Sequence, residues 1–344
     1  MATKIYAYGM DGFITPMMKF FAKEGGLPNF ARFLREGTVN QTYPSFPVWT
    51  PTNWATLSTG AHTGTHSISS WQTLVGPNQL VNSFHGRANN AERIWNALER
   101  NGLKGVAVHY PAAHPSGVKI GYVIDGFGSP GYKATDFEVT AAQAYTTVVS
   151  EASDVSMGHD GSAVRGLRSV EPISALTLTS GWANLPASHS PPLATKFTLS
   201  TRLDGQAKVF HLLALDSRGA GYDRILICRS QNGNGLVASA SLGDWSNWVM
   251  ETFQINGCSQ QASVRFKLLE LTSDGNRLKL YRTQITYTDG FTYGNDELAA
   301  ELIERFGPYQ EHASMTPYTS ALAGTDFTRC VAFCISRWLD NIRG

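Results

Sequence analysis

Thr50 is the residue whose position points most directly to chemistry. It stands before Pro51 at the start of "TPTNWATLSTG", whose apolar spacing and closing Gly60 predict a helix. The N-terminus of a helix attracts phosphate through its free N–H groups and its positive dipole end. A hydroxyl there can attack phosphorus in line if a divalent metal lowers its pKa. A threonine before proline is also a common helix cap, so the residues alone leave both roles open.

Asn53 and Asp11 are the candidates for completing such a site. Asn53 lies one helical turn after Thr50, where its amide can donate to a non-bridging phosphate oxygen. Asp11 ends the apolar run "KIYAYGMD", which predicts a short buried strand. A carboxylate there offers the hard oxygen that a divalent metal prefers, and the alternative is that it caps the turn before Gly12. Asp11 and Thr50 are therefore the candidate metal ligands, and Thr50 and Asn53 the candidate catalytic residues.

Several other side chains of reactive type favour structural roles. His66, in "GAHTGTHSI", is interpreted as a loop histidine that makes hydrogen bonds rather than as a metal ligand. His159, in the Gly-rich "MGHDG", has no strand pattern before it and is not expected to bind a metal. Trp245 and Trp248, in "GDWSNW", are interpreted as packing aromatics, with a sugar-stacking platform as the alternative.

The elements that would position the candidate residues alternate between strand and helix over the first ~130 residues. Helices are predicted at "TPMMKFFAKEGG", "LPNFARFLREG" and "ERIWNALERNG", each with glycine at its end. Further strands are predicted at "KGVAVHYP" and "GYVIDGFG". Strands separated by helices of about ten residues indicate a parallel, doubly wound sheet. Ligands bind beyond the carboxyl ends of the strands in such sheets, which is where Asp11 would lie.

The apolar period changes to two beyond about residue 195. Runs such as "KVFHLLALDS" and "YDRILICRS" predict an antiparallel β unit, and the stretch 273–276 predicts a hairpin turn. We therefore expect an α/β part over 1–135, an irregular linker over 136–194, an antiparallel β insertion over 195–290 and a helical segment over 291–344.

Composition excludes several classes of partner. A net charge of +1 over 344 residues gives no electrostatic footprint for nucleic acid. No apolar run approaches the ~20 residues of a membrane span, and the first residues show no signal-peptide pattern, so a cytoplasmic location is expected. The cysteines lack zinc or CxxC spacing, including the pair Cys330 and Cys334, and are interpreted as buried thiols of a reducing compartment. Nothing in the sequence indicates an oligomeric state.

Taken in order, these motifs resemble the type I phosphodiesterase/nucleotide pyrophosphatase family of the alkaline phosphatase superfamily. That family has a metal-binding Asp at the end of the first strand and a Thr nucleophile nine residues before a Thr-Gly pair. Here Asp11 and Thr50 match those positions, because Thr59-Gly60 follows Thr50 by nine residues. Asn53 matches an asparagine that helps to hold the phosphoryl group. His66-Ser67 departs from the family's usual His-Gly.

The resemblance implies an alkaline-phosphatase-like parallel sheet with helices on both faces and an antiparallel insertion similar to that of some bacterial members, over residues 1 to ~318. It implies metal-dependent hydrolysis of small phosphate mono- or diesters through a phosphothreonine at Thr50, with two zinc ions, or manganese, as cofactors. The family's later Asp-x-x-x-His and Asp-His-Gly segments are not found here. We therefore expect an incomplete catalytic domain whose activity alone is uncertain.

Two alternatives stay open. Within the superfamily, the reaction can instead be that of a phosphonate hydrolase or a phosphomutase. Sulfatases are disfavoured because they need cysteine or serine where this chain has Thr50. Outside it, the missing ligand segments are compatible with a non-catalytic binding module in which the β insertion recognises a partner.

Overall fold

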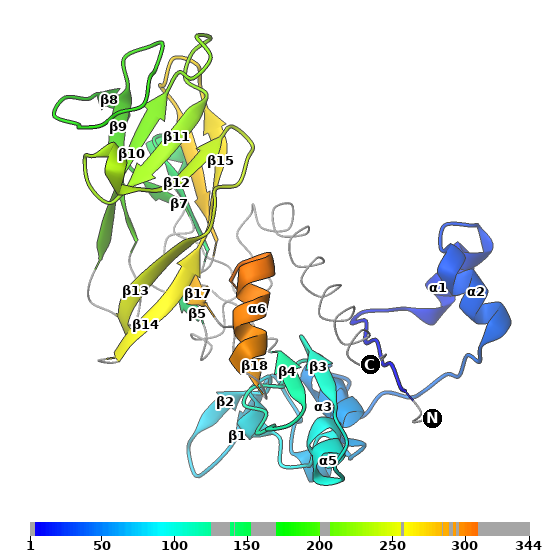
Figure 1. Ribbon diagram of the computed structural model, residues 1–344. Coiled ribbons are helices and arrows are strands. Elements are labelled where there is room, and N and C mark those ends of the chain that lie inside the picture. The colour runs from blue at the N-terminus through cyan, green and yellow to red at the C-terminus, as the bar shows by residue number, and fades with distance from the viewer. Residues whose placement is uncertain are drawn as a thin grey trace.

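The computed structural model describes residues 4–124, 138–140, 142–152, 170–199, 207–255, 258–283, 285–288, 292–293 and 296–308. His159, Cys330, Cys334 and the predicted C-terminal helix after residue 308 lie outside these ranges. Figure 1 shows a helical pair near the N-terminus, a mixed α/β region and a β-rich unit. Among the helices of the described part, none combines the length and apolar character needed to cross a lipid bilayer.

Five α-helices form before residue 101; four lie where the sequence predicts helices, and the fifth, a short one at Thr63–His66, lies in the stretch that was interpreted as a loop. They are α1 (Thr15–Lys23), α2 (Pro28–Glu36), α3 (Thr50–Thr59), α4 (Thr63–His66) and α5 (Ile94–Arg100).

The starts of α1 and α3 differ by one residue from the expected threonine caps. The N-caps are Ile14 and Trp49, which have extended backbone angles, whereas Thr15 and Thr50 are already helical. The following proline is accommodated because N–H groups of the first helical turn have no partner within the helix. The cap role predicted for Thr50 is therefore wrong, and Thr50 is the first residue of α3.

The predicted strand at residues 4–11 does not form. Ile5 and Tyr8 are 79% and 75% exposed, and no β-strand is assigned before β1 (Gln72–Leu74), which pairs with β2 (Leu80–Asn82) in a hairpin. A strand requires a neighbour for its backbone N–H and C=O groups, and none of the described strands pairs with this segment. The apolar run alone therefore predicted a strand that has no pairing partner among the described residues.

The large parallel sheet expected from the first ~130 residues is also absent from the part of the chain that is described. Strands β3 (Val106–Val108) and β4 (Tyr122–Ile124) are parallel as predicted, but they form a small sheet with the antiparallel β18 (Thr292–Tyr293). We call α3, α4, α5, the hairpin β1–β2, this sheet and α6 (Asp296–Phe306) the α/β region. The fold is mixed α/β with several small sheets.

Strands of the β-rich unit form three further sheets and are mostly antiparallel, as expected for residues 195–290. The expected linker also contributes strands: β5 (Glu138–Thr140), β6 (Gln143–Thr146), β7 (Val170–Pro172) and β8 (Thr177–Leu178). The remaining strands are β9 (Leu193–Leu199), β10 (Lys208–Leu215), β11 (Arg224–Cys228), β12 (Leu236–Ser241), β13 (Val249–Ile255), β14 (Cys258–Val264), β15 (Phe266–Leu271), β16 (Leu278–Arg282) and β17 (Ile285–Tyr287).

The predicted hairpin joins β15 to β16, where Asp274 accepts hydrogen bonds from the Asn276 N–H and the Thr272 hydroxyl. The bond from the Asn276 N–H to the Asp274 carboxylate is of the kind by which Asp and Asn side chains stabilise turns.

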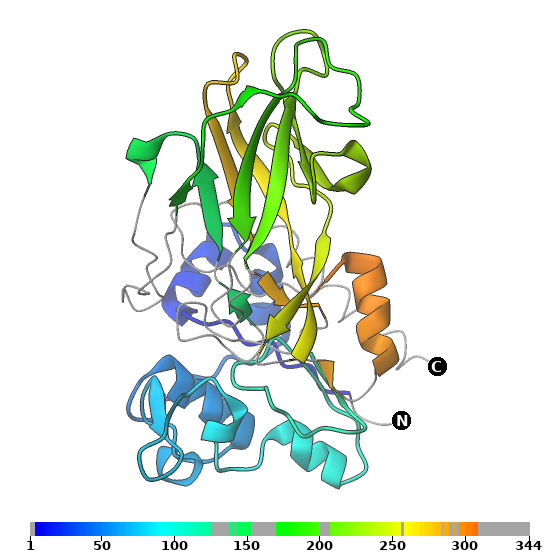
Figure 2. The same cartoon turned by 90° about the vertical axis from the view of Figure 1, so that its left-hand side faces the viewer.

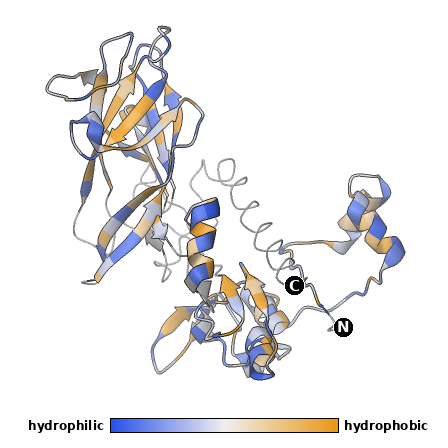
Figure 3. Ribbon diagram, in the orientation of Figure 1, coloured by the Kyte–Doolittle hydropathy of each residue, from blue (hydrophilic) through white to orange (hydrophobic). Residues whose placement is uncertain are grey.

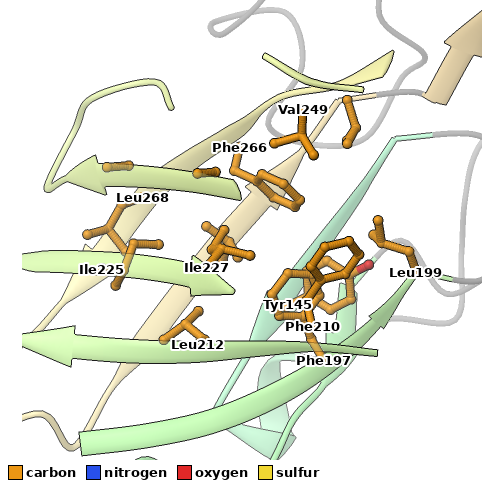
Figure 4. Packing of buried hydrophobic residues seen from close by; sticks show 14 of the residues in the cluster. Tyr145, Phe197, Leu199, Phe210, Leu212, Ile225, Ile227, Val249, Phe266 and Leu268 are labelled. Carbon is orange, nitrogen blue, oxygen red and sulfur yellow. The ribbon is translucent and has the colours of Figure 1, made fainter. Parts of the chain in front are cut away.

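The largest core lies within the β-rich unit. Phe197 contacts Phe210 and Phe266, and Leu212 and Leu268 are fully buried in the same cluster (Figure 4). Hydrophobic residues gather in these strands (Figure 3), and the same unit is seen from its side in Figure 2. Burial of apolar area at ~25 cal/mol per Å² makes this core the main source of stability in the unit.

Helix α6 connects the two larger parts of the molecule. Leu298, Leu302 and Phe306 pack with Val108 and Ile124 of the small sheet. Just after the helix, Gly307 lies so close to the Trp248 indole of the β-rich unit that a Cβ there would overlap the ring. The helix therefore contacts the parallel strands on one side and the β-rich unit at its end.

Candidate active site

Helix α3 carries Thr50 on its first turn and presents an N-terminus without a capping side chain. Trp49, the N-cap residue, makes no side-chain cap hydrogen bond, and the first turn contains no acidic residue. Gly60 ends the helix with φ of 66°, and its N–H donates to the Thr56 carbonyl. The N–H groups of the first turn therefore lack a side-chain cap, and Thr50, half-buried, lies at this end of the helix.

Asn53 connects the helix to the loop before it. Its Oδ1 accepts a hydrogen bond from the Ser45 N–H at 2.8 Å, and its Nδ2 donates to the Trp49 carbonyl at 3.0 Å. These bonds fix the chain that leads to Thr50. The amide has a second N–H with no partner in the described part of the chain, so a contact to phosphate remains compatible with this arrangement.

The structure brings Asp11 to the side of α3. The Trp54 Nε1–H donates to Asp11 Oδ1 at 3.3 Å, and Trp54 lies one helical turn after Thr50. Gly9 lies against the six-membered ring of the same indole, and a Cβ at this position would overlap that ring. Residues 9–11 therefore follow the surface of Trp54 although they do not form a strand.

Tyr110 holds the same helix on the small parallel sheet. Its hydroxyl donates to the Trp54 carbonyl at 2.9 Å, and its ring makes edge contacts with Trp54 and Trp95, each with centroids 5.1 Å apart. Burial raises the pKa of the Tyr110 hydroxyl, so it stays protonated and can donate. Tyr110 follows β3 by two residues, which places α3 at the carboxyl end of that strand.

Sequence reasoning did not single out Gly9, Trp54 or Tyr110. The available signal was the spacing of Trp54, which lies four residues after Thr50 and so on the same face of the predicted helix.

His66 is the last residue of α4 rather than a loop residue, and it has the hydrogen-bonding role that the sequence predicted. Its Nδ1 accepts from the Ile68 N–H at 3.0 Å, so its Nε2 carries the proton and donates to Thr56 Oγ1, also at 3.0 Å. The ring is fully buried. Burial lowers the pKa of His66, and the nearby His62 lowers it further.

The two tryptophans of the β-rich unit have cations over their rings. Arg265 lies over Trp245 and Trp248 at 5.4 and 5.6 Å from the ring centroids, and Lys267 lies 5.5 Å from the centroid of Trp245. These cations cover a ring face of Trp245 and of Trp248, and ring faces are what a sugar would stack on. The arrangement agrees with the interpretation of both residues as packing aromatics.

The donor chemistry of Asp11 and Thr50 fits a hard divalent ion, because both offer oxygen and the Asp11 carboxylate already accepts an orienting N–H. Within the described residues, no group of three or more His, Cys, Asp or Glu side chains is arranged to hold a metal. Two oxygen donors are fewer than the roughly six or more that a hard divalent ion takes, so Asp11 and Thr50 do not complete a metal site by themselves.

Comparison with known proteins decides the family. The model of the type I phosphodiesterase/nucleotide pyrophosphatase family matches residues 9–181, just over half of the chain. The chain belongs to this family. The matched range contains Asp11, Thr50, Asn53 and His66. It ends before β9, so the phosphodiesterase match does not extend to the β9–β17 strands, although the resemblance was expected to reach residue ~318.

No curated protein and no solved structure matches the chain significantly.

Proposed function

We propose that the chain is a metal-dependent hydrolase of small phosphate mono- or diesters in which Thr50 is the nucleophile. Family membership supports phosphoester hydrolysis. The observation that carries the residue assignment is the hydrogen bond from Trp54 to Asp11, which joins the candidate ligand to the helix that begins at Thr50.

The proposed reaction has two displacements. The Thr50 oxygen bonds to phosphorus, and the bond from phosphorus to the leaving alcohol breaks, with the Thr50 proton passing to solvent and the alcohol taking one from it. A water molecule then attacks the phosphorus of the phosphothreonine; the bond from phosphorus to the Thr50 oxygen breaks, that oxygen takes a proton from solvent, the water loses one to it, and the phosphate product leaves. The N–H groups of the first turn of α3 and the Asn53 amide would stabilise charge on the phosphoryl oxygens.

Asp11 and Thr50 would hold the divalent ion, zinc or manganese. When bound, it lowers the pKa of the attacking hydroxyl.

Turnover of p-nitrophenyl phosphodiesters by the full chain with added zinc or manganese tests the proposal. We expect Thr50→Ala to lower kcat/KM by at least about 10³-fold, because no other group replaces the nucleophile. Asn53→Ala is expected to cost about 10²-fold, as for loss of one oxyanion donor. Cys258→Ser is a suitable control because this thiol is exposed and distant in sequence from α3.

Three outcomes would redirect the assignment. Equal turnover by wild type and Thr50→Ala would contradict the nucleophile role. Preference for p-nitrophenyl phenylphosphonate would favour the phosphonate hydrolase alternative. Protein that binds no metal and turns over no ester would favour the binding-module alternative.

A further inference from the structure

We propose that Trp54 is the positioning residue of this site: its indole N–H orients the Asp11 carboxylate for the divalent ion. The inference rests on the proposed function, because it assigns a role in binding the ion that Asp11 would hold. Trp54 itself contacts neither the ion nor the substrate in this proposal and acts through Asp11.

The backbone around Asp11 needs such a contact. Residues 4–11 are exposed and have no strand partner in the described part of the chain, so the sheet does not fix them. Gly12 has φ of 65°, and α1 begins only at Thr15. Within the described residues, the indole of Trp54 is the one side chain that bonds the Asp11 carboxylate.

The bond leaves the carboxylate able to bind a cation. The Trp54 N–H donates to Asp11 Oδ1, and Asp11 Oδ2 has no partner among the described residues. A carboxylate that accepts one N–H bond on one oxygen and presents the other has a restricted orientation, which lowers the entropy that metal binding would lose. Trp54 is itself held by Tyr110 on its backbone and ring, so the donor is fixed relative to Thr50.

Gly9 lies against the same indole and gives a second way to disturb its position. Its Cα lies so close to the Trp54 ring that a side chain would overlap it. Gly9 has no positive φ, so an alanine there is not opposed by the backbone conformation. An alanine at position 9 would therefore have to displace either the Trp54 ring or the backbone that leads to Asp11.

Isothermal titration of the full chain with Zn²⁺, and separately with Mn²⁺, tests the inference. Asp11→Asn identifies the part of the signal that depends on Asp11. Trp54→Phe keeps an aromatic ring and removes only the N–H donor and the five-membered ring, and it is expected to weaken Asp11-dependent binding by about 10-fold, within the range found for loss of an outer-shell partner. Gly9→Ala is expected to weaken it to a similar extent.

Trp71→Phe is the matched control, because this indole contacts Phe84 beside the β1–β2 hairpin. It should leave the affinity unchanged. Thermal melting of each variant separates loss of folding from loss of binding. If Trp54→Phe unfolds, Gly9→Ala still decides.

The outcomes separate the two proposals. A wild-type protein with no Asp11-dependent binding would overturn the metal role in the proposed function and this inference with it. Asp11-dependent binding that is equally strong in Trp54→Phe and Gly9→Ala would overturn the inference and leave the proposed function intact. Equal weakening by Trp71→Phe would also overturn it, because the effect would then be a general one of indole loss.

Discussion

His66 is a residue of the α/β region whose protonation is controlled by the fold. The imidazole must be neutral to accept from Ile68 through Nδ1 while donating to Thr56 through Nε2. Its burial penalises the imidazolium form, which is why its pKa is lowered. The position of a histidine before a predicted loop suggested a hydrogen-bonding role, but its complete burial could not be read from the sequence.

The lowered pKa of His66 predicts that stability falls as the medium becomes acidic. Below about pH 6.5 the unfolded chain binds a proton at this position while the folded chain does not, so the stabilisation present above that pH is lost as pH drops through the folded-state pKa. In His66→Asn the side-chain oxygen can still accept from Ile68, and nothing titrates. Melting temperatures between pH 7.5 and 5.0 should fall less steeply for the variant, and parallel curves would contradict the prediction.

At the scale of single elements, different residues of the chain start, anchor and end helix α3. Pro51 lies in its first turn, the Tyr110 hydroxyl donates to its Trp54 carbonyl, and Gly60 ends it in a left-handed conformation. The sequence predicted the extent of this helix well because proline and glycine act locally. It could not predict the contact to Asp11, because that contact joins residues 43 positions apart.

Replacement by alanine should have opposite effects on stability at Gly60, which ends α3, and at Gly64, which lies in α4. An added Cβ meets no atom within 4 Å at either Gly60 or Gly64, so space does not distinguish them. Gly60 has φ of 66°, where alanine is strained, and Gly60→Ala should destabilise the protein by about 1 kcal/mol. Gly64 is helical within α4, and Gly64→Ala should stabilise it by up to about 1 kcal/mol.

Urea unfolding monitored by circular dichroism compares the two variants with the wild type. Changes of the same sign in both would show that the φ at Gly60 does not control the result.

At the scale of the whole molecule, the chain has more than one core. The large cluster around Phe197 and Phe266 belongs to the β-rich unit, whereas Trp95, Ala107 and Val123 form a smaller cluster under α5. The period-two pattern predicted the first unit well, because each strand buries one face against the opposing sheet. The extended parallel sheet was predicted from alternation alone. The apolar run at residues 4–11 could not reveal that no described strand lies beside it.

Because the cores are separate, we expect a mutation in one core to destabilise its own unit and to leave the stability of the other unit nearly unchanged. Phe197 is 2% exposed, and Phe197→Ala should destabilise the β-rich unit by about 3–5 kcal/mol through the cavity it leaves. Hydrogen exchange of the full chain should then accelerate at β9–β17 and change little at β3 and β4. Uniform acceleration would indicate that α6 couples the two parts into one cooperative unit.

The indole beside Asp11 has a further consequence, because tryptophan emission depends on the charges around the ring. Trp54 lies with its ring centroid 5.1 Å from that of Tyr110 and donates its N–H to the carboxylate that would hold the ion. A paramagnetic ion such as Mn²⁺ at Asp11 would quench this fluorophore at close range. The difference spectrum between wild type and Trp54→Phe would therefore give an optical titration of the site that requires no substrate and no added label.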